Sequence, residues 1–482
     1  MSAPPPSSLA EWSGQTASAP PPRLPPPAAG PRRTLFKRYL HHNYSTFASS
    51  LHYFNRRVTV AGWVVLGGSF AAAVLGADTN QSRSYQTFAL LACLALVAAV
   101  CAPWGYPKVS VRRIMPKFGS VGEPFRYRLI ARSLARRRQC DLTLIDEITD
   151  PSPSFEEFLS TPEPGEERRN WIDRGFGYYR WRWLRSRRLQ ARPMEQTVAD
   201  LPPETECSIT AQLLPLRRGV LRLTGTTVAH PEPLGLFRAV TKLPGPQSVL
   251  ILPRRYPMPL FELPGTMKYQ AGGVSLASSV GESEEFLALR EYRPGDPLRR
   301  MHWKGFAKLG KPIVKEYQDE FFVRHALILD TFGGADQAGM FEEAVSIAAS
   351  LAYTIGNQDS LLDLMFVGPQ AYCFTSGRGV GHIEQILEIL ASVQVCREKS
   401  FESLEHLVLA HARSLSGCVC VLLAWDESRQ RLVRSLLTSQ VPLRVLVLTR
   451  GEENLPPGVM EHEADHFHVL PLDKVAMRLA SL

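Results

Sequence analysis

Two uncharged apolar runs near the start of the chain constrain its fold more than any other feature. The first run covers residues 58–77 and the second covers residues 88–104. A helix rises about 1.5 Å per residue, so each run is close to the length that crosses the roughly 30 Å hydrocarbon core of a bilayer. Because a short polar stretch separates them, the two runs predict a transmembrane helical hairpin. A buried hairpin in a soluble core is the alternative, but such helices seldom stay free of charge over this length.

Basic residues flank the outer ends of this predicted hairpin, whereas the stretch between the two runs holds only Arg83. Short cytoplasmic segments of membrane proteins carry an excess of Lys and Arg. We therefore expect a multi-pass protein of the plasma membrane, with both termini and the large region after the hairpin in the cytoplasm. The flanking residues are Lys37, Arg38, Arg56, Arg57, Lys108, Arg112, Arg113 and Lys117.

The 482 residues are enough for several domains. Residues 1–36 are rich in Pro, Ala and Ser and lack apolar periodicity, which predicts a disordered tail, and residues 37–107 form the hairpin region. The net charge of +9 is modest for this length, and local clusters of charge matter more than the total. Interleaved basic and aromatic residues at 178–188 are also the footprint of nucleic-acid binding, but no nucleic-acid partner is expected. The eight cysteines include no CxxC pair, which indicates reduced structural thiols.

Residues 108–255 contain several segments in which apolar and polar side chains alternate, separated by Gly, Pro and Asp. Such alternation is typical of half-buried strands. We expect an antiparallel β-sandwich-like domain here, with an insertion at about residues 151–202.

The most informative part of the insertion is the sequence YYRWRWLRSRR. As a strand it would place Tyr179, Trp181 and Trp183 on one face and Arg180 and Arg182 on the other. A strand with a solvated basic face is the simplest interpretation. Contact of the two arginines with anionic lipid headgroups is a second hypothesis.

Residues 325–482 show a different pattern, in which short, continuously apolar segments alternate with amphipathic ones. Continuous apolar strands between helices are typical of a parallel sheet covered on both faces. The fold class that we predict is therefore multidomain: a transmembrane α-hairpin, an antiparallel β-sandwich-like domain and a doubly wound α/β domain.

Residues 256–324 join these two architectures and hold the densest cluster of charged and aromatic side chains. Basic residues surround Asp296, and Tyr292, His302 and Trp303 are interleaved among them. One hypothesis is that the segment clamps two domains together, with Tyr292 and Trp303 in the seam. The other is that it is a partner-binding epitope. The basic residues are Arg290, Arg293, Arg299, Arg300, Lys304, Lys308 and Lys311.

The spacing of this segment resembles the signature of the DUF58 family. The residues that carry the resemblance are Arg290, Tyr292, Arg293, Gly295, Asp296, Arg299, Met301, His302 and Trp303. A second stretch, residues 215–237, is similar to a strand pair and turn of the same family, with Glu232, Pro233, Gly235 and Phe237 at the turn positions.

The family resemblance implies that the C-terminal region is similar to a von Willebrand factor A domain. Those domains often hold a divalent cation in an Asp-x-Ser-x-Ser loop, but Phe332 and Gly334 stand at the two serine positions here. A hard cation takes about six oxygen ligands. We therefore expect no metal and no other cofactor, with Asp330, Ser376 and Asp426 as the remnant candidates.

The resemblance also implies a partner, a MoxR-type AAA+ ATPase. The function that we expect is a membrane-anchored, non-enzymatic scaffold or adaptor in a chaperone-like or assembly system. The binding epitope would comprise Arg290, Tyr292, Arg293, Asp296, Arg299, Arg300, His302 and Trp303. Binding of lipid or a cell-envelope polymer is an alternative. A hydrolase that uses His302 and Asp296 is a weaker hypothesis, because no recognised nucleophile or phosphate-binding motif accompanies them.

Overall fold

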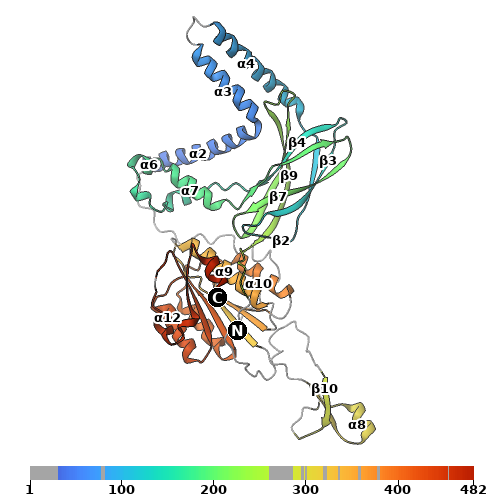
Figure 1. The fold of residues 1–482 in the computed structure, drawn as a ribbon, viewed down its shortest axis with the longest axis vertical. Helices are drawn as coiled ribbons and strands as arrows, with labels where there is room; N and C mark the ends of the chain where they lie inside the picture. Colours follow the sequence, from blue (N-terminus) through green and yellow to red (C-terminus); the bar gives the residue numbers. More distant parts are fainter. Residues whose placement is uncertain are drawn as a thin grey trace. The chain divides into compact units, whose positions relative to one another are not determined.

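The computed structural model describes residues 31–76, 82–259, 286–294, 298, 301–317, 323–334, 337–356, 360–376, 380–453 and 455–481. Two compact units divide between Arg254 and Arg255. The first unit holds three long helices, two β-sheets and several short helices. The second holds a six-stranded sheet with helices and a separate two-stranded sheet (Figure 1).

The helices α3 (Val60–Leu75) and α4 (Ser82–Cys101) form an antiparallel pair (Figure 1). Within the described residues, Arg83–Cys101 is the one helix long and apolar enough to cross a membrane, and only 6% of its apolar window is buried. The shorter helix α3 has 16 residues. It begins after Thr59, whose side chain caps the first turn by accepting a hydrogen bond from the Gly62 N–H. The helical ends thus differ from the predicted runs 58–77 and 88–104.

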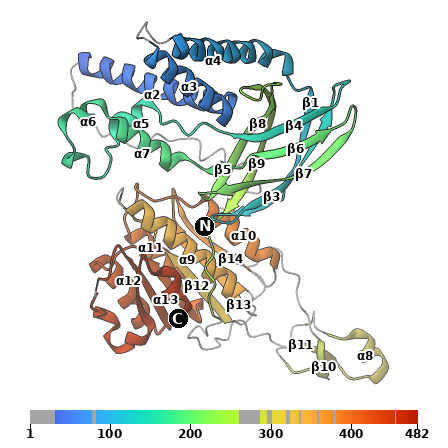
Figure 2. The same ribbon diagram turned by 45° about the horizontal axis from the view of Figure 1, so that its top comes forward.

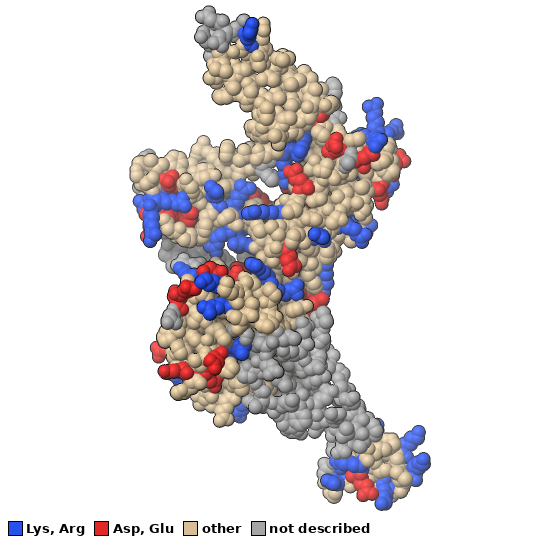
Figure 3. Space-filling model, in the orientation of Figure 1, with Lys and Arg blue, Asp and Glu red and all other residues tan. Residues whose placement is uncertain are grey.

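The surface of this helix pair is apolar. Its face in Figure 3 carries no charged atoms between the base and the tip. Large side chains on both helices are exposed, including Val64, Phe70, Leu90 and Leu96. Because the core helices of soluble proteins bury such side chains, the exposure indicates membrane association.

A further helix, α2 (Pro31–Arg57), precedes the pair. Residues 31–36 are its first turns, so the predicted disordered tail does not extend to residue 36, and residues 1–30 lie outside the described part of the chain. The Arg56 guanidinium at the end of α2 forms an ion pair with Glu147 of the sandwich.

Two sheets pack face to face after the hairpin. One has the order β1 (Val109–Ile114), β3 (Phe125–Ser133), β7 (Glu206–Pro215) and β5 (Ala191–Pro193). The other has the order β2 (Phe118–Ser120), β9 (Arg238–Leu252), β8 (Gly219–Pro231), β4 (Gln139–Ile148) and β6 (Gln196–Leu201). Inward side chains of both sheets, such as Leu129, Leu144 and Ile251, share one core. All of the pairings are antiparallel except that of β2 with β9.

The first part of the insertion, up to Arg188, is helical, whereas its last residues form the sandwich strands β5 and β6, so the predicted basic strand is wrong. It contains α5 (Phe155–Ser160), α6 (Trp171–Phe176) and α7 (Tyr178–Arg188). Trp181 and Leu184, three residues apart, are buried on one side of α7 with Phe158. A short alternating segment is compatible with either structure, and here the spacing of three prevails. Helices α5 and α7 pack on α2 through Tyr44 and Ala48, and Phe176 at the end of α6 contacts Phe36 and Tyr44 of α2.

The Arg180 side chain is only 14% exposed and forms a bidentate ion pair with Glu166, in which Nε lies 2.9 Å from Oε2 and Nη2 lies 2.5 Å from Oε1. Arg180 therefore does not lie on a solvated basic face. Arg182 is exposed, and its contact with lipid remains a prediction.

In the second unit the strand order is β14 (Ala371–Ser376), β13 (Ser360–Val367), β12 (Val323–Leu329), β15 (Gly417–Leu422), β16 (Leu443–Thr449) and β17 (Phe467–Pro471). The sheet is not wholly parallel, because the edge strand β14 runs antiparallel to β13. Helices α11 (Glu402–His411) and α12 (Glu427–Thr438) cover one face. The other face is covered by α9 (Ala338–Gly356) and α10 (Val380–Ser392) (Figure 2).

Candidate functional site

The signature segment belongs to the second unit and forms a two-stranded sheet with one helix. Strands β10 (Phe286–Glu291) and β11 (Ile313–Tyr317) form an antiparallel pair, and the helix α8 (Trp303–Leu309) lies between them in sequence. Met301 adds a bridge to Val314, whose side chain is buried. Two backbone bonds, from Tyr292 to the Pro312 carbonyl at 3.0 Å and from His302 to the Ile313 carbonyl at 2.8 Å, close the segment around its helix.

His302 is the N-cap of α8. Its Nδ1 accepts a hydrogen bond from the Gly305 N–H at 3.0 Å. An acceptor nitrogen is unprotonated, so the cap requires the neutral tautomer with hydrogen on Nε2. A Cβ on residue 305 would lie 2.5 Å from Nδ1, which explains why glycine stands there. His302 therefore has a structural role as the N-cap of α8. A histidine in general acid–base catalysis does not need such a role.

Trp303 is the first residue of α8. Its side chain is 62% exposed and contacts Phe306 edge to face, with ring centroids 6.3 Å apart. Tyr292 is half-buried. That Trp303 anchors the segment in a seam between the two units stays a prediction.

The four arginines of the motif are only partly described. Arg290 is half-buried on β10, and its Nη1 donates to the Glu291 carbonyl at 3.3 Å. Arg293 is exposed. Asp296, Arg299 and Arg300 lie outside the described residues, so their predicted pairing is not placed.

The outer surface of α8 combines apolar and basic side chains. Trp303, Phe306 and Leu309 are exposed on one side of the helix, and Lys304 and Lys308 are exposed on another. Exposed aromatic side chains such as Trp303 are enriched at protein–protein interfaces. We call these five side chains the α8 patch.

A second cluster lies at the carboxyl ends of the parallel strands. Asp330 follows β12 and is fully buried, and Asp426 caps α12. The Arg429 guanidinium lies between them: its Nε is 3.1 Å from Asp330 Oδ2, and its Nη1 is 2.6 Å from Asp426 Oδ2. Arg429 also donates from Nη2 to the Phe332 carbonyl at 3.0 Å and stacks on the Phe401 ring.

Burial and ion pairing act in opposite directions on the pKa values of Asp330 and Arg429. Burial raises the pKa of Asp330, while Arg429 and the backbone N–H groups of Phe332 and Leu423 act against that rise. Burial acts to lower the pKa of Arg429, but Asp330 and Asp426 outweigh it and raise that pKa. The result is a buried cation held by two carboxylates.

The residues present do not fit a divalent cation at this place. The guanidinium already takes the Asp330 and Asp426 oxygens, and the side chains of Phe332 and Gly334 offer none. Ser376 lies at the amino ends of the parallel strands, whereas Asp330 lies at their carboxyl ends. The reason is that β14 is antiparallel and Ser376 pairs with Leu362 near the start of β13. The structure thus brings two of the three remnant candidates together, around an arginine that the sequence prediction missed.

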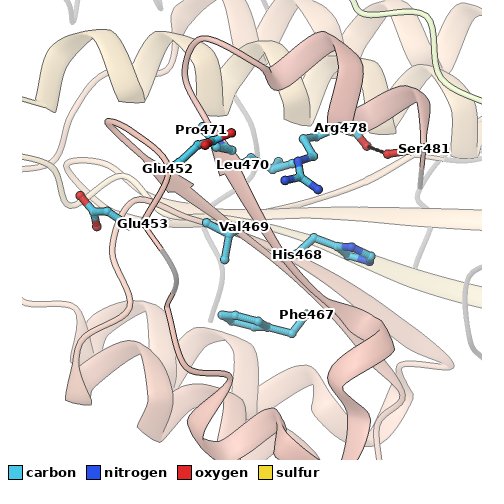
Figure 4. A pocket seen from close by; sticks show the side chains of 9 residues that line it. All are labelled: Glu452, Glu453, Phe467, His468, Val469, Leu470, Pro471, Arg478 and Ser481. Carbon is cyan, nitrogen blue, oxygen red and sulfur yellow. Dashed lines mark hydrogen bonds between the residues drawn. The ribbon is translucent and has the colours of Figure 1, made fainter.

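A pocket of about 520 Å³ lies beside the edge strand β17 (Figure 4). It is lined by His468, Glu452 and Arg478 together with apolar side chains of β17. None of the signature residues lines it. Burial lowers the pKa of His468, and Arg444 adds to that effect.

Residues 288–457 match the family model described as "Protein of unknown function DUF58". The chain contains a DUF58 region. A curated relative, the uncharacterized protein YeaD of Bacillus subtilis (strain 168), is 27% identical over 126 residues, which cover 26% of this chain and 31% of that protein. The DUF58 match therefore includes β10 and α8 as well as the Asp330–Arg429 cluster.

Solved structures resemble the chain only distantly. A CARDB domain of a Pyrococcus furiosus protein is 12% identical and covers 30% of this chain and 90% of its own, with a TM-score of 0.15. A cohesin module of a Clostridium perfringens glycoside hydrolase is 11% identical and covers 30% of this chain and 97% of its own, with a TM-score of 0.16.

Proposed function

We propose that this protein is a membrane-anchored, non-enzymatic adaptor. In this proposal α3 and α4 both span the plasma membrane, and the β-sandwich and α/β units lie in the cytoplasm. The observation that carries the proposal is the exposed, uncharged surface of the helix pair beside a folded sandwich (Figure 3). A helix of 16 residues is about 24 Å long, so α3 needs a locally thinned bilayer or its flanking residues to complete the span.

The orientation rests on the basic residues at both outer ends of the hairpin. Two of these basic residues form ion pairs in the folded sandwich. Arg56 pairs with Glu147, and Arg113 pairs with Asp146. Their charge still counts during insertion, which precedes that folding.

We propose further that the α8 patch docks a MoxR-type AAA+ ATPase, and that the second unit is von Willebrand factor A-like. The strand order with an antiparallel edge strand supports the fold assignment. The exposed Trp303 and the neighbouring lysines support an interface role, because a rigid aromatic side chain can anchor a contact while cations set its register. The hydrolase hypothesis is weaker, because His302 Nδ1 is occupied as a helix cap.

The test is co-purification from gently solubilised membranes. The wild-type protein is expected to recover an AAA+ ATPase, identified by mass spectrometry, and Trp303→Ala or Lys304→Glu with Lys308→Glu is expected to lose it. Arg431→Glu is the matched control, since Arg431 is also an exposed cation but lies on α12. Equal recovery by all variants would reject the α8 patch as the docking site, and absence of any ATPase would reject the adaptor proposal.

A further inference from the structure

The helix α2 presents three distinct sides. Tyr44 and Ala48 pack against the helical insertion. A second side is polar and includes Arg38, Ser45 and Ser49. The third side is apolar and exposed. Its members are Leu35, Phe36, Tyr39, Phe47, Leu51 and Phe54, each at least 46% exposed. Phe36 lies where this side meets the insertion, because its ring also contacts Phe176 of α6 edge to face, with centroids 6.2 Å apart.

The apolar side runs along the helix and is interrupted by the exposed polar residues Asn43 and Ser50. Phe36, Phe47 and Phe54 are eleven and seven residues apart, which are close to whole numbers of helical turns, so they stand in one row. A row of this length on a helix of 27 residues extends for much of its roughly 40 Å. Exposed aromatic side chains in such a row are unusual on a helix that faces only water.

The position of α2 identifies what covers this side. Only Val58 and Thr59 separate α2 from α3, and both are fixed to the sandwich, Val58 by a bridge to Phe237 and Thr59 by hydrogen bonds to Gly235 and Leu236. The C-terminal end of α2 is therefore held at the base of the hairpin. In Figure 3 the edge of α2 on the hairpin's side is free of charged atoms.

We infer that α2 lies along the membrane surface, with the row Phe36–Phe54 inserted at the boundary between headgroups and acyl chains. The inference rests on the proposed insertion of the hairpin and adds a second mode of membrane contact. Helices of this kind bury one apolar side in the interface and leave their polar side in water. Phe and Leu side chains are typical of the buried side of such helices, the Tyr39 ring favours the headgroup level, and Arg38 on the polar side remains in the aqueous layer.

The inference is tested with the full-length protein in phosphatidylcholine nanodiscs. An environment-sensitive fluorescent amino acid is introduced by amber suppression at Phe47, at Ser49 or at Val64. Ser49 is the matched control on the polar side of α2, and Val64 reports the hairpin. Each variant is compared between ordinary lipid and lipid with brominated acyl chains, which quench only by contact.

The probes at Phe47 and Val64 are expected to lose roughly half of their fluorescence or more in brominated lipid, whereas the probe at Ser49 keeps nearly all of it. Quenching at Val64 alone would overturn the inference and leave the membrane anchor intact. A blue-shifted but unquenched probe at Phe47 would also overturn it, because a protein surface such as a second copy of the chain would then cover the row. Quenching at none of the positions would reject the membrane anchor itself.

Discussion

Replacing Arg429 by Gln tests the buried cluster of the α/β unit most directly. The Asp330 carboxylate accepts from Arg429 at 3.1 and 3.4 Å and from the N–H groups of Phe332 and Leu423 at 2.9 and 3.1 Å. The substitution leaves a fully buried carboxylate with only its two backbone donors and removes the cation that pairs with Asp426, which still caps α12. Breaking one side of a buried ion pair costs about 3–5 kcal/mol. For a unit of this size that lowers the melting temperature by roughly 6–20 °C.

The loss is measured by native-state hydrogen exchange of β12 and β15, whose central amides exchange only when the unit opens. Arg431→Gln, an exposed change on the same helix, is the control and is expected to stay within about 0.5 kcal/mol. In the double variant Asp330→Asn with Arg429→Gln no buried charge remains at this pair, so more than half of the loss is expected to return. If Arg429→Gln were as mild as Arg431→Gln, the ion pair would not hold the strand ends together.

The same variant makes a pH prediction. A buried carboxylate whose pKa is raised above its unfolded value destabilises the fold increasingly as the pH rises above that unfolded value. Loss of Arg429 raises the pKa of Asp330 further. The gap in stability between Arg429→Gln and the wild type is therefore expected to be smaller at pH 5 than at pH 8, and a gap that widens at pH 5 would contradict this account.

Four further predictions concern the other features. Trp303→Ala is expected to change stability by less than about 1 kcal/mol because the side chain is mostly exposed, and a larger loss in denaturant titration would support the clamp hypothesis. EDTA and Mg²⁺ are expected to leave the melting temperature of the α/β unit unchanged, since Arg429 takes the oxygens that a cation would need; a shift of several degrees would contradict this. His302→Ala is expected to cost about 1 kcal/mol of local stability and to speed hydrogen exchange in α8, while His302→Asn keeps the cap. Gly62→Ala is expected to loosen the base of α3, because its Cβ would lie 2.2 Å from the Leu236 carbonyl oxygen, and limited proteolysis near residue 236 would detect it.

The sequence predicted best where a pattern had only one structural solution. The continuously apolar segments around Leu327, Val419 and Val445 predicted strands that are covered on both faces. They form the central strands β12, β15 and β16 of the sheet. The segment around Trp181 was too short to separate the two periods, so a helix was taken for a strand. The long helix α2 was missed because its apolar row is interrupted by Ser, Asn and His along the sequence.

The candidate sites show the same limit. Sequence spacing located His302 and Trp303 but not their exposure, because burial depends on what folds beside them. The loss of serine ligands near Asp330 was visible in the sequence, whereas the arginine that replaces a cation stands 99 residues away. Only the ends of parallel strands bring the two together. The distance of Ser376 from Asp330 follows from the antiparallel direction of β14, and the direction of an edge strand cannot be deduced from its own residues.

The turn at residues 232–237 anchors the base of the helical hairpin to the sandwich. The buried Glu232 carboxylate accepts the N–H groups of Leu234, Leu236 and Phe237, which fixes the loop, and the loop in turn receives the first turn of α3. At the other end of the hairpin, the short helix after α4 packs against β8 and β9. No slack linker intervenes at either end. A partner that pulled or twisted the sandwich would therefore move the paired helices with it as one stiff body.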